Sequence, residues 1–206
     1  MLFKSVLAGL SAATMAYAAT PVESGNWVQT SPGVQVQQCE GGVVSGSTFS
    51  IPSTTDGNSS GAGCSNGHLR AENRYTNDYS SGVHQFAGTV HINSFGGDRV
   101  AIKQTFNGPT GPYFILGIKS NGDLYSVEGG ATIASGIATV GSTVTINTVH
   151  NADIQSFRVY VNGAIAYRDD AAPTGTFYDK IGAYTTDSGS GPLSVTWSDV
   201  EFWTRQ

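Results

Sequence analysis

Three short segments of this 206-residue sequence place polar side chains at every second position. Side chains with that spacing in an extended strand lie on one face of a sheet. The first segment carries four ionisable groups in this pattern, His68, Arg70, Glu72 and Arg74. Such a row predicts either a solvated outer face with internal ion pairs or the floor of a cleft that binds an anionic ligand.

The other two segments also break the pattern of an ordinary strand. In the second, Gln104 interrupts an apolar row formed by Val100, Ile102 and Phe106. This interruption indicates a functional side chain, a β-bulge or a glutamine that only bonds to the backbone. In the third, one face carries Tyr178, Lys180, Gly182 and Tyr184. The glycine predicts a gap where a ligand could approach the sheet.

The elements that position these segments are all predicted to be strands. Asn121-Gly122 and Asn162-Gly163 are two-residue hairpin signals, and no segment has a convincing 3.6-residue period. We therefore predict an all-β fold, a two-sheet jelly-roll sandwich of concanavalin-like type, as one domain over residues 19–206. Short extended pieces such as 34–38 precede the main strands. The expected strands are 68–75, 83–92, 98–106, 112–118, 123–128, 143–149, 155–161, 164–168, 178–186 and 193–203.

Composition excludes several classes of protein. Charged residues make up 12% of the chain and hydrophobic residues 39%, which is unlike a disordered polyampholyte. Ten Lys and Arg against fifteen Asp and Glu argue against a nucleic-acid partner. We expect a monomer with no nucleic-acid or membrane partner.

The N-terminus has the pattern of a secretory signal peptide. Lys4 precedes an apolar stretch over 6–17, and Ala16-Tyr17-Ala18 fits the cleavage pattern, so residues 1–18 are predicted to be removed. A membrane anchor is the alternative, but the stretch is shorter than the ~20 residues that a span needs. Cleavage would remove Lys4 and leave nine basic against fifteen acidic residues, a net charge of −6. We expect a secreted, extracellular protein.

Secretion makes a disulfide between Cys39 and Cys64 the default expectation. Two cysteines without nearby histidines make a poor zinc site. Asn58-Ser59-Ser60 is an N-glycosylation sequon in the same Gly- and Ser-rich stretch. It predicts a surface position for Asn58.

The three segments together resemble the alginate lyases of polysaccharide lyase family 7. Residues 70–74, Arg-Ala-Glu-Asn-Arg, are similar to the family's Arg-x-Glu-Leu-Arg strand. Residues 104–106, Gln-Thr-Phe, lie where the family has Gln-Ile-His or Gln-Val-His, and residues 178–184 look like its Tyr-Phe-Lys-x-Gly-x-Tyr. The resemblance covers about 66–203, including the final 200–203. The same jelly roll also carries glucuronan lyases.

The resemblance implies a cleft on the concave sheet and cleavage of an acidic polysaccharide by β-elimination. The C5 proton of a uronate becomes acidic only when the neighbouring carboxylate is neutralised. Arg70 and Gln104 match the family's neutralising positions, and Tyr184 matches its catalytic tyrosine, which removes the C5 proton and protonates O4. A tyrosine ordinarily titrates near ~10, so Arg70 and Lys180 are expected to favour its phenolate form.

The remaining polar residues of the three segments are assigned to binding. Lys180 matches a position that binds a substrate carboxylate, Arg74 is expected at a neighbouring subsite, and Glu72 is expected to orient the arginines. No cofactor or metal is required for this step, although a structural calcium ion at the acidic loops is left open.

The sequence departs from the family at Phe106, where the family has histidine. In mannuronate and glucuronate the C5 proton and O4 leave from one face of the ring, so a single tyrosine can serve both. In guluronate the C5 proton and O4 lie on opposite faces of the ring, so a second proton-transfer group is needed. Phe106 therefore predicts mannuronate-rich alginate or glucuronan as substrate. His68 either replaces the missing histidine or is a strand-end residue, and His150 is expected in a loop.

Three other readings compete with the lyase. A non-catalytic carbohydrate-binding module would keep the cations without needing Tyr184. A glycoside hydrolase needs two carboxylates, for which Asp199 and Glu201 are the available pair. A structural cell-wall protein is the third reading. The sequence leaves endo or exo action open.

Overall fold

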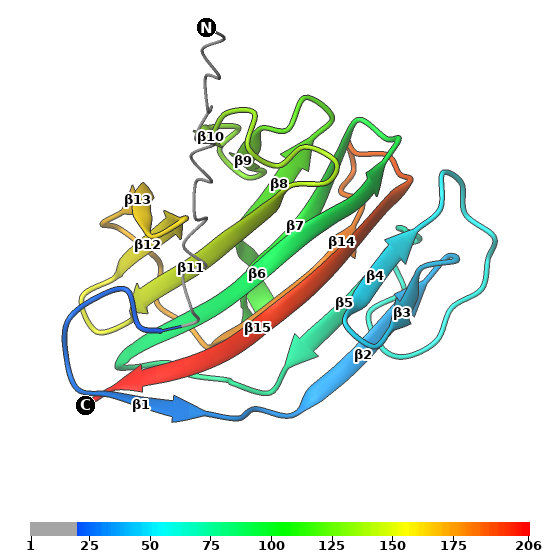
Figure 1. Ribbon diagram of the computed structural model, residues 1–206. Helices are drawn as coiled ribbons and strands as arrows, with labels where there is room; N and C mark the ends of the chain where they lie inside the picture. The colour runs from blue at the N-terminus through cyan, green and yellow to red at the C-terminus, as the bar shows by residue number, and fades with distance from the viewer. Residues whose placement is uncertain (1–19) are drawn as a thin grey trace, which may run out of the picture.

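Two antiparallel sheets pack face to face in the computed structural model, which describes residues 20–206 (Figure 1). The predicted signal peptide lies outside the described residues. Within them, no helix is long and apolar enough to cross a membrane. The two packed antiparallel sheets confirm the predicted two-sheet, all-β sandwich.

The larger sheet has eight strands and forms one layer of the sandwich. β1 (Trp27–Thr30) pairs with β15 beside the main path of the sheet. The order of the other strands is β13 (Ala164–Asp169), β12 (Ser156–Val161), β11 (Thr143–Asn151), β6 (Val83–Phe95), β15 (Leu193–Arg205), β4 (Thr48–Ile51) and β3 (Val43–Ser45).

The second sheet has seven strands and includes all three segments that the sequence singled out. A 3₁₀ turn at Gly108–Thr110 joins its strands β7 and β8. The order is β10 (Thr132–Ala134), β9 (Leu124–Ser126), β8 (Gly111–Lys119), β7 (Arg99–Asn107), β14 (Phe177–Tyr184), β5 (Arg70–Tyr75) and β2 (Val34–Cys39).

Apolar side chains from the facing sides of both sheets fill the space between them. The largest fully buried ones include Trp197, Phe49, Phe86, Phe114 and Phe157. Each of these rings removes a large apolar area from water, which is the main favourable contribution to folding. The outer faces of the sheets stay available for polar residues.

All ten expected strands are present, and the two hairpin signals lie between strands. Asn162 and Gly163 have φ angles of 50° and 79°, as a two-residue type I′ turn between β12 and β13 requires. At Asn121-Gly122 the connection between β8 and β9 is longer, and only the glycine has positive φ. Strands β1, β3, β4 and β10 were not predicted.

A bulge in β7 corrects the predicted apolar row. The register with β8 shifts between Ala101 and Lys103, so the alternation changes phase along the strand. Ile102 therefore belongs to the core, as does Val100, whereas Phe106 lies with Gln104 on the opposite, solvent-facing side. The predicted common face for Ile102 and Phe106 was wrong.

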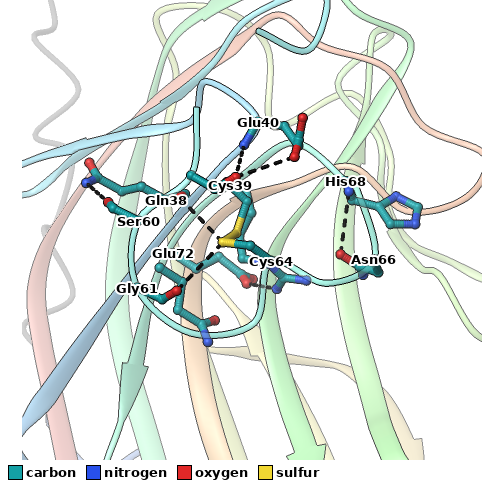
Figure 2. Close-up of a disulfide and its surroundings, with 12 residues drawn as sticks. Gln38, Cys39, Glu40, Ser60, Gly61, Cys64, Asn66, His68 and Glu72 are labelled. Atoms are coloured by element: carbon teal, nitrogen blue, oxygen red, sulfur yellow. Dashed lines mark hydrogen bonds and ion pairs between the residues drawn. A yellow bond between two sulfur atoms is a disulfide. The ribbon is translucent and has the colours of Figure 1, made fainter. Parts of the chain in front are cut away.

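The predicted disulfide joins Cys39, the last residue of β2, to Cys64 (Figure 2). Cys64 lies in residues 52–69, the segment between β4 and β5, which we call the tethered loop. The Cα atoms of the two cysteines are 5.2 Å apart. Asn58 is exposed in the same loop, in agreement with its expected surface position.

A polar cluster is buried between the sheets behind β7 and β14. Lys103 Nζ donates hydrogen bonds to Asp179 Oδ1 at 2.6 Å and to Thr148 Oγ1 at 3.0 Å. Nearby, His150 lies in β11 rather than in the expected loop. It is 1% exposed, and its Nδ1 is 3.0 Å from the Tyr79 hydroxyl. Burial among aromatic rings lowers the pKa of His150 to about 4.

This burial predicts a pH-dependent stability. Between pH 6.5 and pH 4 the unfolded chain holds a proton on residue 150 that the folded protein does not, so stability falls as the pH falls. His150 alone accounts for a loss of about 3 kcal/mol over this window. Urea unfolding at pH 7 and pH 4.5 measures this dependence. His150→Gln is expected to flatten it, whereas His91→Gln, on the outer face of β6, leaves it unchanged. Equal slopes for all three proteins would contradict the assignment.

Candidate active site

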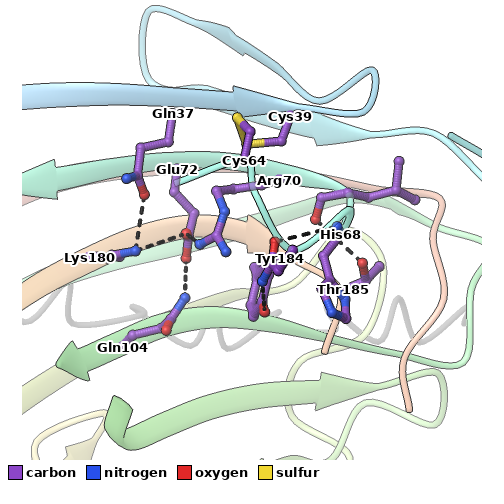
Figure 3. A network of polar contacts seen from close by, with 12 residues as sticks. Gln37, Cys39, Cys64, His68, Arg70, Glu72, Gln104, Lys180, Tyr184 and Thr185 are labelled. Carbon is purple, nitrogen blue, oxygen red and sulfur yellow. Dashed lines mark hydrogen bonds and ion pairs between the residues drawn. A yellow bond between two sulfur atoms is a disulfide. The ribbon is translucent and has the colours of Figure 1, made fainter. Parts of the chain in front are cut away.

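The buried carboxylate of Glu72 is the centre of the polar network on the seven-stranded sheet (Figure 3). Glu72 is 1% exposed. Arg70 donates to its Oε2 and Gln104 Nε2 donates to its Oε1. Lys180 Nζ lies 3.8 Å from Oε2. We call these four residues the Glu72 cluster.

Strand pairing brings the cluster together from segments far apart in the sequence. β14 lies between β5 and β7. Its Gly182 pairs with Glu72 of β5, and its Lys180 pairs with Gln104 of β7. Tyr184 is paired with Arg70 in the same register. The three segments that the sequence singled out are thus neighbouring strands, and their polar rows share one face.

The structure explains the glycine at position 182 by contact with a neighbouring strand rather than by the predicted gap for a ligand. Its φ is +143°, and a Cβ there would lie 2.1 Å from the carbonyl oxygen of Ala71 on β5. A side chain would therefore collide with the neighbouring backbone. The glycine permits the close approach of β14 to β5, which places Glu72 among its partners.

Tyr184 stands at one end of the cluster, with Arg70 stacked on it. The guanidinium carbon of Arg70 is 4.0 Å from the centre of the tyrosine ring. Asn66 Nδ2 donates to the Tyr184 hydroxyl oxygen at 3.0 Å. Burial raises the pKa of Tyr184, while Arg70 and the Asn66 hydrogen bond oppose that rise.

The balance at Tyr184 differs from the expectation. Arg70 does favour the phenolate, but Lys180 is not among the groups that shift its pKa, and burial outweighs the favourable contacts. The protein without ligand therefore holds Tyr184 as a neutral phenol at neutral pH. The hydroxyl is a proton donor in this state.

Lys180 is itself buried and depends on its partners for its charge. Burial lowers the pKa of Lys180, and the adjacent Glu72 carboxylate opposes this shift. Its Nζ also donates to Gln37 Oε1 on β2 at 3.0 Å. Arg70 and Lys180 against Glu72 leave the cluster one positive charge in excess, which suits one anionic group of a ligand.

The cluster forms the floor of an open cleft of about 600 Å³. Phe106 and Tyr178 form an aromatic wall, with ring centres 5.2 Å apart and nearly parallel. Arg74 lies over the Tyr178 ring at 4.1 Å and pairs with Asp78 at 2.6 Å. The cleft thus combines cations and aromatic surface, a lining that suits an anionic ligand with apolar faces.

His68 is close to Tyr184 but does not line this cleft. Its Nε2 is 3.0 Å from Asp187 Oδ1, and its ring centre is 5.5 Å from that of Tyr184. It lines a neighbouring hollow of about 270 Å³. The other carboxylate pair considered, Asp199 and Glu201, lies on β15 in the opposite sheet.

Sequence reasoning missed Gln37 and Asn66, which complete the surroundings of Lys180 and Tyr184. Gln37 is 7% exposed and comes from the edge strand β2, whose polar sequence gave no distinctive spacing. Asn66 comes from the tethered loop, where its position two residues after Cys64 was the available signal. Among residues 20–206, no group of three or more His, Cys, Asp or Glu side chains could hold a metal ion.

Removal of the Glu72 carboxylate is expected to destabilise the fold. Glu72→Ala leaves two buried cations, Arg70 and Lys180, without their counter-charge, which costs about 3–5 kcal/mol in the free energy of unfolding. Glu128→Ala, at the exposed rim of the same cleft, is the matched control and is expected to stay within about 0.5 kcal/mol of the parent. Chemical denaturation measures both. Similar values for the two variants would contradict this account of the cluster.

Comparisons with known proteins place the fold. No protein-family model and no curated protein matches the sequence. The alginate lyase from Corynebacterium sp. matches with a TM-score of 0.58 and 18% identity, over 75% of this chain and 75% of that one. The family 7 alginate lyase A1-II′, as a variant in complex with product (GGG), gives 0.60 and 13% identity, over 82% and 93%.

A third structure is the alginate lyase AlyC3 in complex with dimannuronate. It gives a TM-score of 0.53 and 11% identity, over 68% of this chain and 72% of that one. Identities this low establish similarity of fold and nothing finer. The chain has the two-sheet jelly-roll fold seen in alginate lyases of polysaccharide lyase family 7.

Proposed function

We propose that this protein is a secreted polysaccharide lyase that cleaves β-1,4-linked polyuronate by β-elimination. The observation that carries the proposal is that Arg70, Gln104, Lys180 and Tyr184 line one cleft, with Arg70 stacked on the Tyr184 ring. Those groups supply what the reaction needs, which is neutralisation of a carboxylate next to a proton-transfer group. The fold shared with alginate lyases supports the same reaction.

The excess positive charge of the Glu72 cluster binds the substrate carboxylate. Arg70 and the second N–H of Gln104 donate hydrogen bonds to it, which stabilises the charge that develops when the C5 proton leaves. Lys180 adds a cation at the same floor. Glu72 keeps these donors in place and prevents the two cations from repelling each other.

Tyr184 performs both proton transfers in this proposal. Its phenolate removes the C5 proton, the C4–O4 bond breaks as the C4–C5 double bond forms, and the phenol returns the proton to O4. The products are a 4,5-unsaturated uronate end and a shortened chain, with no water consumed. The step ends with the phenolate restored, so the neutral phenol of the free protein must lose its proton to enter the reaction.

Phe106 restricts the substrate to polymers in which a single side chain can carry out both proton transfers. Its side chain has no transferable proton, and it packs on Tyr178 in the cleft wall, at the position where the resembling family has a histidine. We therefore propose mannuronate-rich alginate or glucuronan, in which the C5 proton and O4 leave from one face of the ring. The structure of AlyC3 in complex with dimannuronate is compatible with this proposal.

A non-catalytic binding module is the second candidate, favoured by one observation. Burial raises the pKa of Tyr184, so the free protein lacks the phenolate that the reaction requires. A binding module would use the same cations and aromatic wall to hold an acidic polysaccharide without turnover. The measurement of product formation separates the two functions.

Product formation is measured by incubating the protein with polymannuronate, polyguluronate or glucuronan. The unsaturated product of elimination absorbs near ~235 nm. We expect a rise with polymannuronate or glucuronan, and a loss of about 10²–10⁴-fold in rate for Tyr184→Phe. Tyr160→Phe, on the opposite sheet, is the control that keeps its activity. No absorbance change with any polymer across pH 5–10, with binding retained, would establish the binding module instead.

Substitution of Phe106 tests the proposed specificity. Phe106→His introduces a second proton-transfer group into the cleft wall and is expected to add measurable cleavage of polyguluronate. Phe106→Leu keeps the wall apolar and is expected to leave polyguluronate uncut. The ratio of initial rates on polyguluronate and polymannuronate is the readout. Polyguluronate as the preferred substrate of the parent protein would refute the role given to Phe106.

A further inference from the structure

The tethered loop reaches Tyr184 from above the cluster. Cys39, Arg70 and Tyr184 lie in one row across β2, β5 and β14. The disulfide joins the loop at Cys64 to the first residue of that row. Two residues later, Asn66 contacts the hydroxyl of the tyrosine at the other end of the row (Figure 3 shows the disulfide and Tyr184 on either side of Arg70).

The orientation of the Asn66 carboxamide is set within the loop. The backbone N–H of His68 points at Asn66 Oδ1 at 3.5 Å, as Figure 2 shows. The oxygen of the carboxamide therefore faces a donor, and the Nδ2 group faces the Tyr184 oxygen at 3.0 Å. Asn66 thus donates a hydrogen bond to the tyrosine and does not accept one.

We propose that Asn66 is a positioning residue that acts through Tyr184 by donating a hydrogen bond to its oxygen as the phenolate forms, and that the Cys39–Cys64 disulfide keeps it there. The role in turnover rests on the proposed lyase function. The effect on Tyr184 itself does not, because the contact exists in the protein without substrate.

An uncharged hydrogen-bond donor at the Tyr184 oxygen acts differently from the charged groups around that tyrosine. The titratable and charged groups that face Tyr184 are Arg70 and Glu72 on β5, His68 in the tethered loop and Asp187 after β14. Arg70 stabilises the phenolate, whereas Glu72 and Asp187 oppose it. Asn66 stabilises the charged form by hydrogen bonding without adding a charge to the cleft.

The experiment measures the ionisation of Tyr184 directly, in protein labelled with [¹³Cζ]tyrosine. The Tyr184→Phe variant identifies the resonance of residue 184, and an NMR pH titration without substrate gives its pKa. We expect Asn66→Ala to raise this pKa by about one unit, since a donor to the charged form is lost. Asn66→Asp, which replaces the donor by a carboxylate, is expected to raise it further.

Two further variants control for damage to the loop. Ser65→Ala alters the adjacent residue, whose side chain bonds to none of the described residues, and is expected to leave the Tyr184 pKa unchanged. A Cys39→Ser and Cys64→Ser double variant, checked for folding by thermal unfolding, is expected to raise that pKa by less than Asn66→Ala does. An unchanged pKa in the double variant would remove the disulfide from the proposal.

Turnover supplies the second readout. In the lyase assay, Asn66→Ala is expected to move the acidic limb of the kcat/KM profile to higher pH by the same shift as the NMR titration, with KM little changed. A Tyr184 pKa unaltered by Asn66→Ala overturns the proposal, whatever the activity. A parent protein that forms no unsaturated product overturns the proposed function instead, while the titration still decides whether Asn66 acts on Tyr184.

Discussion

Burial of a single carboxylate, Glu72, is the constraint on which the cleft floor depends. An ionised side chain that is 1% exposed must be paired and hydrogen-bonded, because burial of a bare charge costs many kcal/mol. Arg70, Gln104 and Lys180 meet this need, and in doing so they are fixed in one place. The carboxylate also sets the charge of the site, since it cancels one of two cations and leaves one in excess. The close approach of β14 to β5 that Gly182 permits brings Glu72 to these partners.

The register between β7 and β14 is fixed by contacts on both faces of the seven-stranded sheet. On the core side, Lys103 and Asp179 form a fully buried ion pair between β7 and β14. On the cleft side, Gln104 and Lys180 occupy the next position along each strand. A slip of one residue would move every side chain to the other face, so it would expose the buried pair and bury the cleft groups. The polar core cluster therefore specifies the register that the cleft floor requires.

Local patterns predicted most of the strands and the three polar rows because each depends on residues that are close in sequence. The disulfide was predicted from two cysteines in a chain whose first residues have the pattern of a secretory signal peptide. The phase change that puts Ile102 in the core comes from a bulge, which pairing with β8 creates and which alternation alone misplaces. Gln37 and Asn66 were missed because their roles arise from contacts 143 and 118 residues away in the sequence. No spacing rule within a segment reports such contacts.

The positive charge of the Glu72 cluster cannot stabilise both the bound substrate carboxylate and a phenolate at Tyr184 in the proposed reaction. The substrate carboxylate takes up the single positive charge in excess at the Glu72 cluster, so that charge is no longer available to a phenolate at Tyr184. Burial already raises the pKa of that tyrosine, and a carboxylate bound beside it raises the pKa further. A neutral donor escapes this conflict, because the substrate cannot cancel a charge that the donor does not carry. Asn66 is such a donor, and its place on a disulfide-tethered loop keeps it at the phenol oxygen while the cleft floor binds the anion.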